Sequence, residues 1–148
     1  MKRLKTAAKW AAFLAFLALA AWFWMQMPVR ITDAKGEDVD YIEIFNGGNG
    51  ERAVIEDPET IAIIMEDLRD VKVQRKRISA GYKGYSLRIT IHYKNFTLFP
   101  WKEFIVNTSN VLRNDPFFYE VVQGDIDYYH LLSFVCEPEE DPSAQPES

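Results

Sequence analysis

The chain has 148 residues, a single cysteine and a net charge of −5 at pH 7. This length suits one domain and not two, and one cysteine excludes an intramolecular disulfide. An acidic chain of this kind is not expected to bind nucleic acid. The charge is uneven, because the segment 71–102 carries eight basic residues and no acidic one.

Residues 10–27 form an apolar run that is interrupted only by Gln26. As a helix these eighteen residues would span about 27 Å, which is enough for a bilayer core. Basic residues precede the run, whereas few follow it closely. By the positive-inside rule, residues 1–9 are then a cytoplasmic stub and the remainder lies outside. We therefore predict a single-pass protein of the cell membrane.

A cleaved secretory signal is the alternative interpretation, since Ala18-Leu19-Ala20 resembles a cleavage site. Cleavage there would leave the apolar residues 21–25 as a free end in water, which favours the anchor. No cysteine follows the run closely, so a lipoprotein anchor is excluded. Both interpretations place the domain on the extracytoplasmic side.

A linker is predicted over the polar segment 28–40, followed by a β-hairpin of strands 41–45 and 51–56 around the glycine-rich turn 46–50. This turn leads into a strand, so it is not a phosphate loop. Asp57 as N-cap and Pro58 in the first turn predict a helix that ends near Asp70. Its apolar residues fall at helical spacing on one buried stripe: Ile61, Ile64, Met65 and Leu68.

Further strands are predicted downstream at 71–79, 85–94, 96–101, 104–106 and 117–122. Tyr85 to Lys94 alternates most cleanly between apolar and polar residues. A last helix carries the stripe Tyr128, Leu131, Leu132 and Val135, and the acidic tail 137–148 is expected to be disordered.

The predicted fold class is α+β, with a domain over 41–136. The transmembrane helix is followed by a mainly antiparallel sheet with two helices on one face. The order is β-β-α-β-β-β-β-α, not counting the short strand 104–106.

No motif in the chain fixes a chemistry. The two histidines, His92 and His130, are expected on the surface without the convergent partners that metal binding or acid–base catalysis needs. A G-x-S-x-G motif is absent. We therefore expect no catalytic residues, no metal site and no cofactor.

The basic segment is the most unusual surface feature. Arg75, Lys76 and Arg77 could form an anionic contact near the membrane, with lipid headgroups or wall polymers. Alternatively, these charges pair with acidic neighbours across the sheet. Strict alternation over 71–78 places Arg75 and Arg77 on one face, and because neither face is wholly apolar we expect an edge strand.

Aromatic residues are dense in the second half of the chain: Phe99, Trp101, Phe117, Phe118 and Tyr119. They predict core packing or, less often, a partner-binding patch.

The domain resembles small membrane-anchored or lipid-anchored extracytoplasmic domains of unknown function from Gram-positive bacteria. The resemblance covers about residues 41–135. It rests on Ile42-Glu43-Ile44-Phe45-Asn46-Gly47, on Ile55-Glu56-Asp57-Pro58-Glu59-Thr60-Ile61, on Gly84-Tyr85-Ser86-Leu87-Arg88-Ile89, and on Phe118-Tyr119. It implies no catalytic residue.

These features favour a non-enzymatic binding or interaction domain at the outer membrane surface, such as a sensor or accessory subunit. Its partner would be a protein or an anionic envelope component. The alternative is a regulatory or structural partner of another membrane protein. A cell-envelope hydrolase is the least favoured hypothesis.

Overall fold

The computed structural model describes residues 2–84, 86–95 and 101–136, with side chains from residue 6. It consists of an N-terminal apolar helix and one mixed domain, so the predicted α+β class is confirmed. The helices are α1 (Lys2–Gln26), α2 (Pro58–Asp70) and α3 (Tyr128–Ser133), with a 3-10 turn at Gly36–Asp38. The strands are β1 (Val29–Arg30), β2 (Val39–Asn46), β3 (Arg52–Ile55), β4 (Lys72–Ile78), β5 (Leu87–Tyr93), β6 (Glu103–Thr108), β7 (Val111–Asn114) and β8 (Phe117–Gln123).

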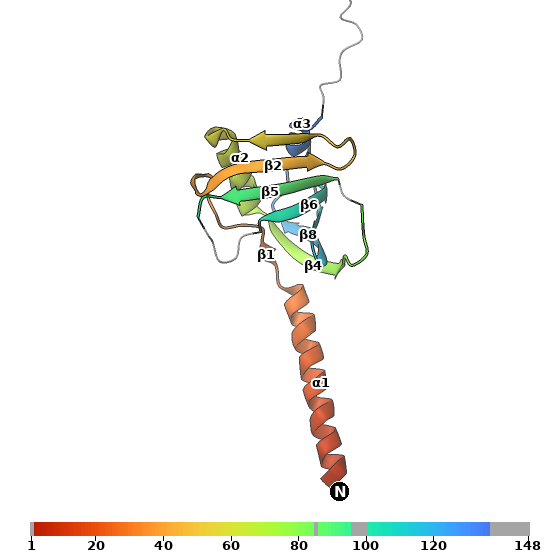
Figure 1. The fold of residues 1–148 in the computed structure, drawn as a ribbon. Coiled ribbons are helices and arrows are strands. Elements are labelled where there is room, and N and C mark those ends of the chain that lie inside the picture. Colours follow the sequence, from red (N-terminus) through yellow and green to blue (C-terminus); the bar gives the residue numbers. More distant parts are fainter. Residues whose placement is uncertain (1, 85, 96–100, 137–148) are drawn as a thin grey trace, which may run out of the picture.

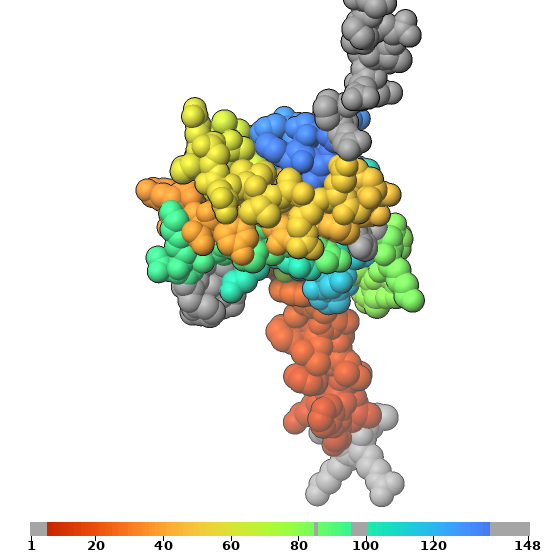
Figure 2. All heavy atoms as spheres, turned by 45° about the horizontal axis from the view of Figure 1, so that its top comes forward, coloured from red at the N-terminus to blue at the C-terminus, as the bar shows by residue number. Residues whose placement is uncertain are grey.

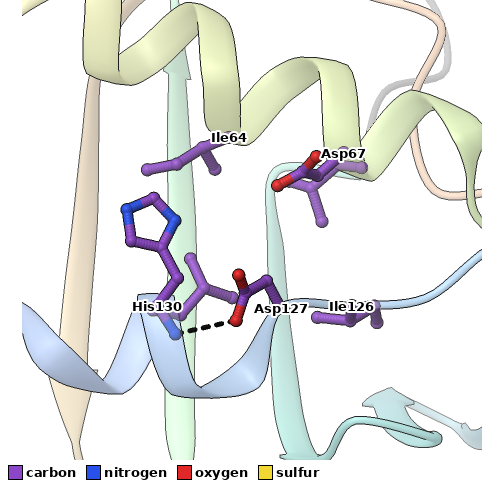
Figure 3. Close-up of a pocket in the computed structure, with 7 residues that line it drawn as sticks. Ile64, Asp67, Ile126, Asp127 and His130 are labelled. Carbon is purple, nitrogen blue, oxygen red and sulfur yellow. Dashed lines mark hydrogen bonds between the residues drawn. The ribbon is translucent and has the colours of Figure 1, made fainter.

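The eight strands form one antiparallel sheet in the order β1-β4-β8-β7-β6-β5-β2-β3. Helices α2 and α3 lie side by side on the same face of this sheet, as the prediction required (Figures 1 and 3). The opposite face, which we call the outer face, carries no helix among the described residues. In Figure 1 the α1 helix leaves the domain below β4 and β8.

Apolar and polar residues alternate along the strands, so apolar side chains lie on one face of the sheet and polar side chains on the other. In β5, Leu87, Ile89 and Ile91 are buried toward the helices, while the residues between them lie on the outer face. The predicted phase of this strand is therefore confirmed. The predicted stripe of α2, with Met65 at its centre, closes the core from the other side.

Local signals set the start of α2 where the sequence predicts it. The Asp57 carboxylate accepts hydrogen bonds from the Thr60 backbone N–H at 2.8 Å and from the Thr60 hydroxyl at 2.6 Å. The side-chain bond and the backbone bond from Thr60 lower the pKa of Asp57. This cap satisfies one of the N–H groups that a helix end leaves unpaired.

Residues 28–40 differ from the predicted linker, because they are part of the domain. Val29 and Arg30 form β1, and the side chains of Ile31, Thr32 and Val39 are buried. Single apolar residues in a polar segment give no periodic signal, so only the packed structure reveals their burial. The short strand β7 was also not predicted, because its four residues do not alternate between apolar and polar side chains. The predicted strand at 96–101 and the acidic tail at 137–148 fall largely outside the described residues.

We expect Ile31→Ala to lower the free energy of unfolding by about 2–5 kcal/mol, as for other buried isoleucines. Ile31 is only 1% exposed, although it lies in the segment that looked like a linker. Ile63→Ala is the matched control, because Ile63 on α2 is 49% exposed. Chemical denaturation of both variants measures the difference. Equal stabilities would show that residues 28–35 are not integral to the fold.

Candidate functional site

The strand β4 runs back toward the end of α1. Only two residues separate α1 from β1, and β1 pairs antiparallel with β4 through Val29↔Val73 and Arg30↔Lys72. Because β1 leads away from the helix, the residues of β4 from Lys72 to Arg75 lie progressively closer to the end of α1. The basic strand is thus brought beside α1 by backbone pairing.

Side chains then join the two elements. The Gln74 amide donates a hydrogen bond to Gln26 Oε1 at 2.5 Å. The Arg75 guanidinium lies 4.0 Å from the centroid of the Trp24 ring and donates to the Trp24 carbonyl at 3.3 Å. The Trp24 ring also meets Phe117 of β8 edge-on, with centroids 5.8 Å apart. The end of α1 therefore docks on β4 and β8.

By length and composition, the segment Thr6–Gln26 of α1 is apolar enough to cross a membrane, and none of its hydrophobic stretch is buried in the domain. A secretory signal has the same properties. In either case the last turn of α1 packs on the domain, as the contacts of Trp24 show.

The three predicted anion-contact residues do not form one cluster. Arg75 packs on Trp24, Lys76 pairs with Glu120 at 2.9 Å, and Arg77 stacks 4.4 Å from the centroid of Phe118. A bulge lies between Arg75 and Arg77 in the pairing with β8. It sets Arg75 opposite Tyr119 and Arg77 opposite Phe118, on different faces. The prediction that Arg75 and Arg77 share a face is therefore wrong, because an inserted residue reverses the alternation.

The prediction of an edge strand holds for the second half of β4. Beyond Val73 no described strand pairs with β4 on the side away from β8. Positive charges on such an edge oppose pairing with another chain.

A groove of about 310 Å³ lies on the outer face, over strands β2, β3, β5 and β6. Its walls are mostly charged and polar: Glu43, Phe45, Arg52, Arg88, Thr90, His92 and Glu103. Sequence reasoning missed this site, because its residues come from strands whose pairing no local signal reveals.

Cross-strand register arranges the groove in rows. In the first row Phe45 stands between Arg52 and Arg88, and each guanidinium lies 5.9 Å from the centroid of its ring. This row is cationic with an apolar centre, an arrangement stabilised by the ring quadrupole.

The next rows are acidic and aromatic. Thr90 stands between Glu43 and Glu103, and Tyr41 stacks on His92 with centroids 4.0 Å apart. Glu43 pairs with Arg52 at 2.8 Å, whereas His92 Nε2 lies 3.8 Å from Glu43, too far for a hydrogen bond. The groove therefore places two arginines beside two glutamates on one open surface.

A second hollow lies between α2 and α3 (Figure 3). The carboxylates of Asp67 and Asp127 approach each other there from the two helices, beside His130. Asp127 caps α3 by accepting a hydrogen bond from the His130 backbone N–H at 2.9 Å. Burial, and then the charge of Asp127, raise the pKa of Asp67. The hollow holds only about 10 Å³, room for roughly one water, so it is a helix contact and not a ligand site.

The structure also places the possible metal ligands and the aromatic residues that the sequence analysis singled out. Within the described ranges, no group of His, Cys, Asp and Glu is arranged to hold a metal ion. Phe118 and Tyr119 are buried, and Trp101 and Phe117 pack against the core, as the core interpretation of the aromatics predicts. Phe99 lies outside the described residues.

No protein-family model matches the chain, and no curated protein or solved structure is significantly similar to it. The resemblance to Gram-positive extracytoplasmic domains therefore stays a prediction, and the case for function rests on the chain's own geometry.

We expect a short bis-maleimide reagent to cross-link Gln26→Cys to Gln74→Cys within one chain, in a Cys136→Ser background. The two glutamine side chains are hydrogen bonded, so their replacements lie within reach of the reagent. The control pair is Gln26→Cys with Val54→Cys, which lies on β3 at the opposite edge of the sheet. Mass spectrometry identifies the product. Equal cross-linking of both pairs would mean that α1 does not dock on β4.

We expect Asp67→Asn to raise the melting temperature slightly near pH 7 and to have no effect near pH 3. A raised pKa in the folded state means that the ionised carboxylate destabilises the fold. This penalty disappears as the pH falls through the folded pKa toward the unfolded value of 3.8. Glu66→Gln, on the same helix, is the control for loss of one charge. A stabilisation by Asp67→Asn that persisted at pH 3 would contradict this electrostatic origin.

Proposed function

We propose that the protein is a membrane-anchored extracytoplasmic binding module whose outer-face groove takes a short zwitterionic ligand of the peptide type. One observation carries the proposal: the groove sets a cationic row, Arg52 and Arg88, beside an acidic row, Glu43 and Glu103. A ligand with a carboxylate at one end and an ammonium at the other matches this pattern.

The spacing of the rows supports a ligand of dipeptide length. Residues two apart along a β-strand are separated by about 7 Å. Two residues of extended peptide also span about 7 Å. The carboxylate of a dipeptide can therefore meet the arginines while its amino group meets the glutamates. The Phe45 ring between the arginines offers an apolar surface to the peptide.

A ligand would exchange with contacts that the groove charges already make, such as the ion pair of Arg52 with Glu43 at 2.8 Å. The Arg52 side chain is 63% exposed in this pair. The Glu43 side chain is only 22% exposed, so a ligand carboxylate would compete with a partly buried partner for the exposed Arg52 guanidinium. The groove also lies on the face that α2 and α3 leave open, so binding needs no rearrangement of the core.

Separate features of the sequence support the proposed location of the domain outside the cytoplasm. The basic residues before α1 and the scarcity of basic residues after it favour a cytoplasmic N-terminus and an external domain. Trp22 and Trp24 stand near the outer end of the helix, where indole rings prefer the membrane–water interface.

We expect alanyl-alanine to bind the full-length protein in detergent micelles, and the dipeptide with both ends capped to bind at least tenfold more weakly. Each charge-assisted hydrogen bond contributes about 1.5–3 kcal/mol, equivalent to roughly 10–100-fold in Kd. Arg88→Gln should weaken binding by a similar factor. Isothermal titration calorimetry, with circular dichroism as the check on folding, measures both effects.

Arg69→Gln is the matched control, because Arg69 lies on α2, away from the groove. Equal binding of free and capped dipeptides would overturn the zwitterion proposal. Hydrolysis of the dipeptide that depends on Glu43 or Glu103 would instead support the hydrolase hypothesis. An absence of binding would favour the role of a structural or regulatory partner of another membrane protein.

A further inference from the structure

The end of β4 and the loop after it form a basic and apolar tip beside α1. We call residues 77–84 the β4 tip. They follow Arg75, which is level with Trp24 in the last turns of α1. Arg75 lies opposite Tyr119 and Ile78 opposite Phe117, two residues apart on β8, so Ile78 lies about 7 Å beyond Arg75. In Figure 1 this strand slants past the end of α1, and Figure 2 shows the region near residue 80, in green, on the side from which the helix emerges.

The side chains of the β4 tip suit a membrane interface. Ile78 is 67% exposed and Tyr82 is 52% exposed, although both are large apolar or aromatic residues. Arg77 and Lys83 are exposed beside them, and the acidic neighbour of the tip is Asp115, whose carboxylate accepts a hydrogen bond from the Ser79 hydroxyl at 2.5 Å. Apolar and tyrosine side chains gain by leaving water at the headgroup layer, and basic residues gain from anionic lipid.

The tip is held in shape by bonds to the rest of the domain. The buried Arg113 of β7 donates hydrogen bonds to the carbonyls of Tyr82 at 2.9 Å and Gly84 at 3.0 Å. The Ser79 N–H donates to the Pro116 carbonyl at 2.9 Å. The Tyr82 ring packs edge-on against Phe118, with centroids 5.1 Å apart. A loop fixed in this way loses little conformational entropy on binding.

Other basic residues of β4 are already engaged. Arg75 packs on Trp24 and Lys76 pairs with Glu120, whereas Arg77 stacks on Phe118 and precedes the exposed Ile78. The basic residues of the tip itself are Arg77 and Lys83, only one of which belongs to the predicted triplet.

We propose that the β4 tip inserts into the headgroup layer of an anionic bilayer, as a second attachment beside α1. Ile78 and Tyr82 enter the interface, while Arg77 and Lys83 bind lipid phosphates. The proposal rests on the membrane anchoring by α1 and does not involve the outer-face groove. The tip would add a second attachment to the contacts by which the end of α1 docks on β4 and β8, and the two together would fix the tilt of the domain on the bilayer.

An environment-sensitive fluorophore at Ala80→Cys, in a Cys136→Ser background, tests the insertion. The full-length protein is reconstituted in vesicles of neutral lipid, with or without anionic phosphatidylglycerol, and with lipids that carry a shallow quencher. We expect at least twofold quenching in anionic vesicles at low salt, and less at high salt because ions screen the attraction. Flotation of the vesicles reports anchoring by α1 separately.

Control labels and variants test whether the quenching arises at the β4 tip. A label at Val54→Cys, at the far edge of the sheet, should not be quenched. Arg77→Gln with Lys83→Gln should lower the quenching at residue 80, whereas Arg52→Gln with Lys94→Gln, which removes the same charge elsewhere, should not. Quenching that is equal in neutral and anionic vesicles, or unchanged by the tip variant, would overturn the proposal. A response to soluble polyphosphate but not to anionic vesicles would assign the tip to an envelope polymer and overturn it equally.

Discussion

The antiparallel pairing of β1 with β4, only two residues after α1, is the constraint on which the placement of the domain depends. It forces β4 back toward the helix and brings a strand rich in arginine and lysine to the end of an apolar segment. Trp24 then supplies a ring for Arg75, so a charge that would otherwise be desolvated at the junction is stabilised by cation–π contact. The side of the domain that faces the helix follows from this pairing.

The placement of both helices on one face of the sheet leaves the opposite face open. The concentration of apolar residues against α2 and α3 leaves polar side chains on the outer face, where cross-strand neighbours set the charge pattern. There, Arg52 and Arg88 flank Phe45 while Glu43 and Glu103 flank Thr90. Between the helices the hollow is too small for anything beyond a water, and its two aspartates repel each other.

The positive charges of the basic segment have different roles, although they look alike in the sequence. Arg75 joins the domain to α1, Lys76 neutralises Glu120, and Arg88 lines the groove. Only Arg77 and Lys83 are presented next to exposed apolar side chains at the β4 tip. The proposed binding groove and the proposed membrane contact lie on different parts of one sheet, so the two proposals are compatible with each other.

The sequence by itself determined the features that depend on neighbours in the chain. The apolar run of α1, the Asp57 cap and buried stripe of α2, and the alternation of β5 could all be predicted, because helical and strand periodicity are local properties. Only the tertiary structure decided that Ile31 is buried, that a bulge turns Arg77 to the face opposite Arg75, and that Glu43, Arg88 and Glu103 share a groove. These features depend on the register between strands that are distant in the sequence, and a shift of one residue moves every later side chain to the other face.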